Sequence, residues 1–132
     1  MKNTIAILFF TFLISSCGDE NCNRSDLTCT EDLRSISVEI RNQNGVNVIL
    51  DSTNTKNSND LILFSQRRSE IENYSFHIVI SDSELDQIDF DGTTLVFEGW
   101  LDGIIVINQE FVIGRDCCHI EKLEGPEIIS MQ

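Results

Sequence analysis

The sequence predicts an all-β fold: a single antiparallel β-sandwich of about seven strands with at most one short helix. Apolar and polar residues alternate over several short segments, which is the period of a strand with one buried face. Asn44-Gly45 and Asp102-Gly103 are typical of tight hairpin turns, because a type I′ turn requires positive φ at both central positions. Several such strands within roughly 100 residues indicate a sandwich.

The first predicted strands flank Asn44-Gly45. Residues 35–42 (SISVEIRN) place three aliphatic side chains on one face, and residues 46–50 (VNVIL) resume the alternation after the turn. Residues 51–60 (DSTNTKNSND) contain no large apolar side chain and predict a polar loop. The apolar run 61–64 (LILF) predicts another short strand.

In the second half, residues 74–80 (YSFHIVI) predict a strand with one apolar face: Tyr74, Phe76, Ile78 and Ile80. The one candidate helix covers residues 81–88, with Ser83 as its N-cap. Residues 93–113 predict two strands joined at Asp102-Gly103. The last predicted strand covers Cys117 to Leu123 and ends before Gly125-Pro126, because proline cannot donate to a sheet ladder.

The N-terminus predicts export. Lys2 precedes an almost unbroken apolar run, residues 5–14. A run of about ten residues is too short for a transmembrane helix, which needs ~20, so residues 1–16 are interpreted as a signal peptide. No later segment is long and apolar enough to span a bilayer.

The end of this segment, "ISSC" at residues 14–17, resembles the lipobox of bacterial lipoproteins. The resemblance implies cleavage before Cys17 by signal peptidase II, and attachment of diacylglycerol and an N-acyl chain such as palmitate to that cysteine. "CGDE" at residues 17–20 is similar to the start of Bacteroidota-type lipoproteins. Gly18 follows the lipidated cysteine in place of the aspartate that retains such proteins in the inner membrane. The expected location is therefore the cell envelope, lipid-anchored in the outer membrane, facing the periplasm or the cell surface.

Charge restricts the partners. The chain has 22 acidic and 9 basic residues and a net charge of −13. Nucleic acid is excluded as a partner, because Lys and Arg must neutralise its phosphates. The membrane is then contacted through the lipid, and an envelope protein or a glycan is the expected partner of the domain. The predicted organisation is a polar tether over residues 17–34 and a sandwich domain over residues 35–132, in a chain of 132 residues.

The five cysteines divide into one lipidated residue, Cys17, and an even set of four. An even number in an oxidising compartment indicates disulfides. Two bonds from the tether to the pair near the C-terminus would hold the tether against the last strand, and the sequence leaves the pairing open. The candidates are Cys22, Cys29, Cys117 and Cys118.

A metal-binding or redox site using Cys117, Cys118 and His119 is the alternative. On a strand, only Cys117 and His119 share a side, and no Cys-x-x-Cys motif accompanies them. We therefore expect no metal and no other cofactor. Neither His119 nor His77 lies near a recognisable serine motif, and His77, between apolar neighbours, is interpreted as a structural histidine. No catalytic residue is predicted.

Residues 35–123 resemble transthyretin-like and carboxypeptidase-regulatory-like domains in their order of strands and turns. The resemblance implies a small Ig-like or transthyretin-like sandwich and a non-enzymatic role as a binding, spacer or accessory module. The ligand and the oligomeric state are left open.

Overall fold

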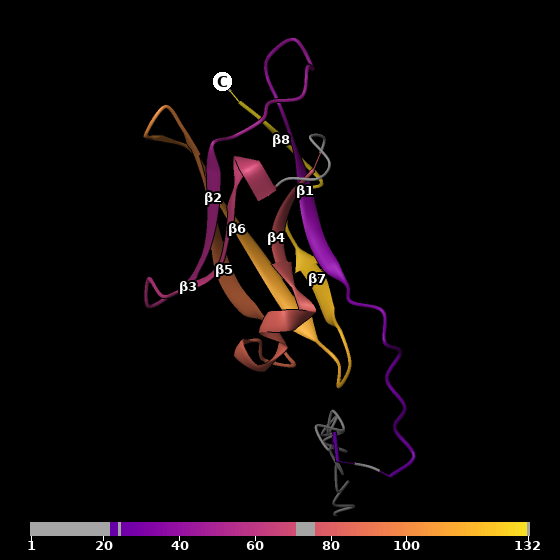
Figure 1. Cartoon of the computed structure of the whole chain (residues 1–132). Helices are drawn as coiled ribbons and strands as arrows, with labels where there is room; N and C mark the ends of the chain where they lie inside the picture. Colours follow the sequence, from indigo (N-terminus) through magenta and orange to yellow (C-terminus); the bar gives the residue numbers. More distant parts are fainter. Residues whose placement is uncertain (1–21, 24, 71–75, 132) are drawn as a thin grey trace, which may run out of the picture.

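The computed structural model describes residues 22–23, 25–70 and 76–131, and shows eight strands in two sheets (Figure 1). The predicted all-β sandwich is confirmed. Within these ranges no helix is both long enough and apolar enough to cross a bilayer. The predicted signal peptide, Cys17 and Tyr74 lie outside the described residues.

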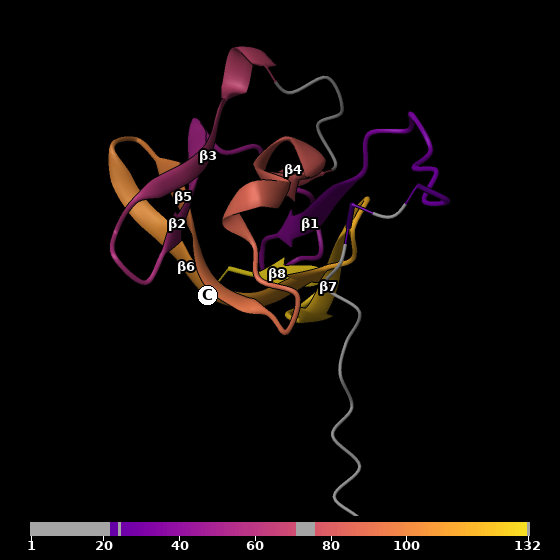
Figure 2. The ribbon, with the colours of Figure 1, turned by 90° about the horizontal axis from the view of Figure 1, so that it is seen from below.

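One sheet has five strands and the other has three. The five-stranded sheet has the order β3-β2-β5-β6-β7, and the three-stranded sheet has the order β4-β1-β8. Seen along the strands, the larger sheet curves until β7 lies close to β8 and β1 (Figure 2). The bounds are β1 Ser35–Arg41, β2 Ser52–Asn57, β3 Ile62–Arg67, β4 His77–Ser81, β5 Thr93–Leu101, β6 Ile104–Arg115, β7 Ile120–Glu124 and β8 Ile128–Ser130; the two short 3-10 helices are η1 Arg68–Glu70 and η2 Asp82–Gln87.

The pairing is antiparallel except between β1 and β8, which run parallel. β8 was not predicted. After β7 the chain passes through Gly125, which has φ +128°, and crosses to the other sheet. There Ile128 to Ser130 pair with Glu39 to Arg41. A strand of three residues with one half-buried side chain has too little alternation to be recognised from sequence.

The Asn44-Gly45 turn forms as predicted, but the second strand of its hairpin does not. Gly45 has φ +76°, and the Asn42 side chain accepts the N–H groups of Asn44 and Val46. Beyond the turn only an isolated bridge joins Arg41 to Asn47. Residues 46–51 instead carry the chain from one sheet to the other, and Leu50 is fully buried on the way.

The predicted polar loop at residues 51–60 is wrong, because β2 occupies most of it. β2 lies between β3 and β5 and buries two side chains, Thr53 at 1% exposure and Thr55 at 0%. Threonine is β-branched and suits a pleated strand. Its hydroxyl needs a partner when buried, and that of Thr55 donates to the carbonyl of Val79.

The inward face of β4 also differs from the prediction. His77 and Val79 are fully buried, whereas Phe76 is 47% exposed. Residues paired across a ladder share a face, and His77 pairs with buried Val38 on β1. Val79 is an extra residue on β4 at the register shift between the two strands, and this brings Ile80 inward as well.

The Asp102-Gly103 hairpin is confirmed, with φ +51° and +76° at its two residues. The predicted helix is η2, a 3-10 helix, and its cap is Ser81 rather than Ser83. The Ser81 side chain accepts the N–H of Ser83, and Glu84 accepts the N–H of Ser81 in return, completing a capping box. Ser81 and Ser83 are both of a residue type that favours the N-cap position, and only the structure shows which one takes it.

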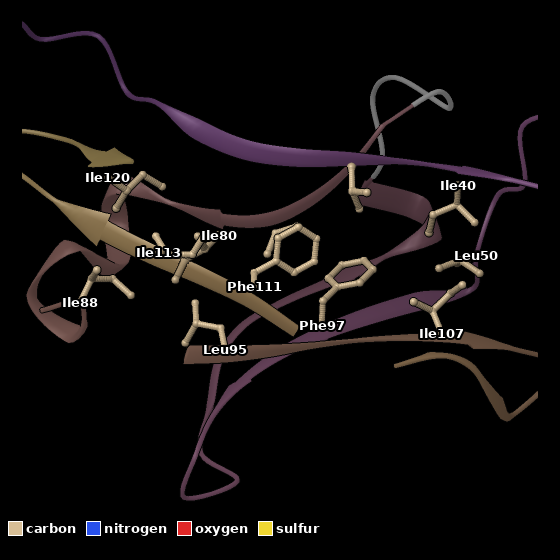
Figure 3. Packing of buried hydrophobic residues seen from close by; sticks show 12 residues of the cluster. Ile40, Leu50, Ile80, Ile88, Leu95, Phe97, Ile107, Phe111, Ile113 and Ile120 are labelled. Carbon is tan, nitrogen blue, oxygen red and sulfur yellow. The ribbon is translucent and has the colours of Figure 1, made fainter. Parts of the chain in front are cut away.

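The core lies between the sheets and is almost entirely aliphatic (Figure 3). Phe97 on β5 and Phe111 on β6 meet edge to face at its centre, with ring centroids 6.2 Å apart. Gly99 allows β5 to approach the crossover segment, since a Cβ there would lie 2.5 Å from Leu50 Cδ1. The core therefore ties both long strands to the smaller sheet.

Candidate functional site: the disulfide-bonded segment and the His119 cluster

Two disulfides join the N-terminal segment to the turn between β6 and β7. Cys22 is bonded to Cys117 and Cys29 to Cys118, with Cα atoms 5.2 and 5.3 Å apart. The predicted stapling is confirmed, and the pairing left open by the sequence is now defined. All residues from 25 to 35 are exposed, including Leu27 and Leu33. Because this segment buries so little apolar surface, the two disulfides hold it, together with hydrogen bonds of Thr30 and Arg34.

The adjacent cysteines do not lie on a strand, which corrects the predicted strand at residues 117–123. β7 begins only at Ile120, and Cys117 to His119 form the turn before it. The Oδ1 atom of Asp116 accepts hydrogen bonds from the N–H groups of both Cys118 and His119, each at 2.7 Å. In this turn both cysteines can reach the same exposed segment, which the alternating faces of a strand would prevent.

His119 connects this turn to two distant parts of the chain. Its side chain is 9% exposed. Nδ1 lies 2.8 Å from Asp82 Oδ2, and Nε2 lies 2.9 Å from Thr30 Oγ1. The ring therefore bridges the Asp82 carboxylate and the Thr30 hydroxyl, with Nδ1–H donating to Asp82.

Asp82, at the start of η2, gathers four hydrogen bonds. Besides His119, its carboxylate accepts the N–H groups of Arg34 and Ile120, each at 2.8 Å. Its own N–H donates to the Arg34 carbonyl. Burial raises the pKa of Asp82, but the hydrogen bonds from His119, Ile120 and Arg34 together hold it below its usual value. The ionised carboxylate therefore fastens three chain segments at one point.

The pKa of Asp116 is lowered for a similar reason. The Cys118 N–H is the main cause; burial opposes it, and the His119 N–H adds to it. We refer to Thr30, Asp82, Asp116 and His119 together as the His119 cluster. The prediction included His119 but missed Thr30 and Asp82, which nothing nearby in the sequence marks. Asp116 could have been found, because an aspartate two residues before the bonded N–H is typical of an Asx turn.

The hydroxyl, imidazole and carboxylate of the His119 cluster have the distances of the relay that activates the nucleophile in serine hydrolases. In those enzymes, donors positioned for the oxyanion complete the site. In this protein the hydroxyl, the carboxylate and the imidazole belong to three separate chain segments, which they hold together: the N-terminal segment, η2 and the β6–β7 turn. Those contacts account for the burial of the imidazole, and we assign the His119 cluster a structural role.

The alternative metal ligands, Cys117 and His119, both have other partners. The sulfur of Cys117 is in a disulfide and so offers no thiolate, and both ring nitrogens of His119 are hydrogen-bonded. Among the described residues there is no group of three or more His, Cys, Asp or Glu side chains able to hold an ion.

His77 is a structural histidine of the core, as its neighbours predicted, and is completely buried. Its Nε2 lies 3.1 Å from the Val48 carbonyl, which connects β4 to the crossover segment. Burial lowers the pKa of His77, and the hydrogen bond to Val48 opposes this only in part. The ring is therefore neutral in the folded protein.

At the opposite end of the sandwich lies an open depression lined by polar and basic residues. Its rim is formed by the start of β2 and the end of β3: Asp51, Ser52, Arg67, Arg68 and Ser69. The Nη1 atom of Arg68 lies 3.3 Å from the Oδ1 atom of Asp51, forming an ion pair. Trp100 is half-buried and pairs with Ser52 across the sheet.

Comparison with known proteins finds no matching family model, no matching curated protein and no matching solved structure. The fold and these contacts define the class of the protein: a two-sheet all-β domain whose N-terminal segment is stapled to it by two disulfides. The resemblance to transthyretin-like and carboxypeptidase-regulatory-like domains stays a prediction.

Proposed function

We propose that this protein is a bacterial envelope lipoprotein, anchored in the outer membrane through acyl chains on Cys17. Its sandwich domain acts without catalysis, as a binding, spacer or accessory module toward an envelope protein or a glycan. The observation that carries this proposal is the pair of disulfides. Such bonds persist in oxidising compartments outside the cytosol, which is where a lipobox-containing signal peptide delivers a chain.

The cysteine count supports the same proposal. Of five cysteines, four are paired with one another. The fifth is the residue that the lipobox marks for acylation. Several acyl chains give firm anchoring, since one chain alone binds a membrane only marginally.

The test is expression of the full chain in a Gram-negative bacterium. We expect the wild-type protein to fractionate with the outer membrane and to gain the mass of a diacylglycerol and an acyl chain on Cys17. Cys17→Ser should leave an unacylated precursor, and a signal peptidase II inhibitor should leave an uncleaved precursor that carries diacylglycerol but no N-acyl chain. A mature protein found soluble in the periplasm, with an unmodified cysteine, would overturn the proposal.

The alternative function, a metal-binding or redox lipoprotein, requires free thiols at Cys117 and Cys118. The measurement is the intact mass after alkylation, with and without reductant, together with elemental analysis. On the proposed function, residues 18–132 take up no alkyl group before reduction and four afterwards. Alkylation before reduction, with near-stoichiometric zinc or copper, would favour the alternative.

A further inference from the structure

The disulfide between Cys22 and Cys117 changes how far the domain can stand from a lipid on Cys17. Without it and the Cys29–Cys118 bond, the chain from Cys17 to the start of β1 at Ser35 could extend by up to about 60 Å, at ~3.3–3.6 Å per residue. With it, only five residues separate Cys17 from a cysteine bonded to the domain. Five residues extend by at most about 17 Å.

The bonded turn lies at one defined end of the sandwich. The β6–β7 turn, the start of β1 and η2 share this end (Figure 1). The Asn44-Gly45 turn and the Asp102-Gly103 hairpin lie at the other (Figure 1). β6, which runs between the two ends, has 12 residues, or roughly 40 Å at ~3.3 Å per residue.

The rest of the N-terminal segment is also held to the domain, so it cannot lengthen the connection between the lipid and the domain. Cys29 is bonded to Cys118, Thr30 is hydrogen-bonded to His119, and Arg34 is bonded through both backbone groups to Asp82. The length between lipid and domain is therefore set by the residues before Cys22.

We propose that the Cys22–Cys117 bond leaves a leash of only five residues between the lipid on Cys17 and the domain. This leash holds the cysteine-bearing end of the sandwich at the membrane surface and directs the opposite end outward. This inference rests on the proposed lipidation of Cys17. It assigns the outward end as the surface available to a partner across the envelope. That end carries exposed apolar and basic side chains: Val46, Arg67, Arg68, Ile104 and Ile105.

Charge acts against the leash at short range. The membrane-proximal end carries exposed carboxylates at Asp86, Asp89, Asp91 and Glu121. Anionic lipid headgroups repel these groups within about a Debye length, ~8–10 Å at physiological salt. The leash therefore holds this end near the membrane against the repulsion, because the covalent connection limits how far the end can move away.

The experiment uses the lipidated full chain in vesicles of phosphatidylethanolamine and phosphatidylglycerol that contain dansyl-labelled lipid. Trp100, the single tryptophan, lies near the outward end. A second protein, Trp100→Phe/Asp86→Trp, moves the donor to the membrane-proximal end. We expect several-fold stronger energy transfer to the dansyl lipid from position 86 than from position 100.

Two variants with the same loss of one disulfide separate the leash from general stability. Cys22→Ser/Cys117→Ser lengthens the leash to the twelve residues up to Cys29, and the contrast between positions 86 and 100 should shrink. Cys29→Ser/Cys118→Ser leaves the five-residue leash, and the contrast should remain. The inference would be overturned by equal transfer from positions 86 and 100 in the proteins that keep both disulfides. It would also be overturned by an equal loss of this contrast in the two disulfide variants.

Failure of the lipidation itself gives a different result. An unacylated protein would not float with the vesicles and would lack the added mass, so no transfer would be measured from either position. Flotation with equal transfer rejects the leash and leaves the lipoprotein proposal standing.

Discussion

At the scale of single residues, the polar groups inside this protein connect segments that are far apart in the chain. His119 joins Thr30, 89 residues before it, to Asp82, 37 residues before it. A buried polar group that loses its partner costs about 1–3 kcal/mol, more than its hydrogen bond contributes when made. The His119 cluster is therefore sensitive to the loss of any one member.

We predict that His119→Ala lowers the free energy of unfolding by about 1–3 kcal/mol, because Asp82 loses its buried partner. Thr30→Val should cost less, about 0.5–1.5 kcal/mol, because Thr30 is exposed and water can replace it. Urea unfolding of the disulfide-intact proteins measures both. An unchanged midpoint for His119→Ala would contradict the structural role.

A second prediction concerns pH. The pKa of His77 is lowered on folding, so below ~6.5 the unfolded chain binds more protons than the folded one. The stability linked to His77 is complete above that value and is lost as the pH falls below it. The pKa values of Asp82 and Asp116 are also lowered, and their contribution is lost in a second step as the pH falls through ~4.

Urea unfolding at pH 7, 6, 5, 4 and 3 checks this. His77→Gln, which keeps an amide donor for the Val48 carbonyl, should flatten the decline between pH 7 and 5 and leave the later one in place. The same slope between pH 7 and 5 in this variant and in the wild type would exclude His77 as its source.

At the scale of elements, β2 shows how a strand can form from polar residues. Its inward side chains are threonines, and its partners β3 and β5 cover both of its edges. The Thr55 hydroxyl also donates a hydrogen bond to the Val79 carbonyl at the edge of the other sheet. The Oε1 atom of Gln66, on β3, accepts the N–H of Ile78 at 3.4 Å. These contacts satisfy backbone groups on the edge of β4 that has no neighbouring strand, which would otherwise be open to pairing with another chain.

We predict that Thr55→Val lowers stability by about 1–3 kcal/mol although it keeps shape and volume, because the buried Val79 carbonyl loses its donor. Asn54→Thr, on the outward face of the same strand, should change stability by no more than about 0.5 kcal/mol. Thermal unfolding of both variants gives the comparison. Equal effects would mean that strand propensity, and not the bond to Val79, determines the cost.

At the scale of the whole molecule, the two disulfides close overlapping loops. Either bond alone closes a loop of roughly 90 residues, which restricts the unfolded chain by about 4.6 kcal/mol of loop-closure entropy. Once one bond is present, the other closes a ring of only about ten residues, residues 22–29 with 117–118, and adds about 2.7 kcal/mol.

The cost of removing them is therefore expected to be non-additive. Removing one bond, by Cys22→Ser/Cys117→Ser or Cys29→Ser/Cys118→Ser, should lower the free energy of unfolding by about 3 kcal/mol. Removing both should lower it by about 7 kcal/mol, more than the two single costs together. Urea unfolding of the three proteins measures this, and a double cost no larger than the sum would contradict the loop argument.

The sequence alone determined the class of fold and the use of the cysteines. Alternation over residues 35–41, and the Asn-Gly and Asp-Gly turns, depend only on local backbone preferences, which the residues themselves carry. The even set of four cysteines likewise predicted two bonds to the pair at positions 117 and 118 without any knowledge of their geometry.

Only the tertiary structure decided which cysteines pair, which face of β4 is buried, and that β2 is a strand. Each depends on partners distant in the chain: the Asp116 turn that presents both cysteines, the register of β4 on β1, and the two strands beside β2. The His119 cluster has the same origin, because Thr30, Asp82 and His119 meet only after both sheets have packed. Contacts that depend on how distant segments pack leave no periodic pattern in the sequence, which is why none of these could be predicted from it.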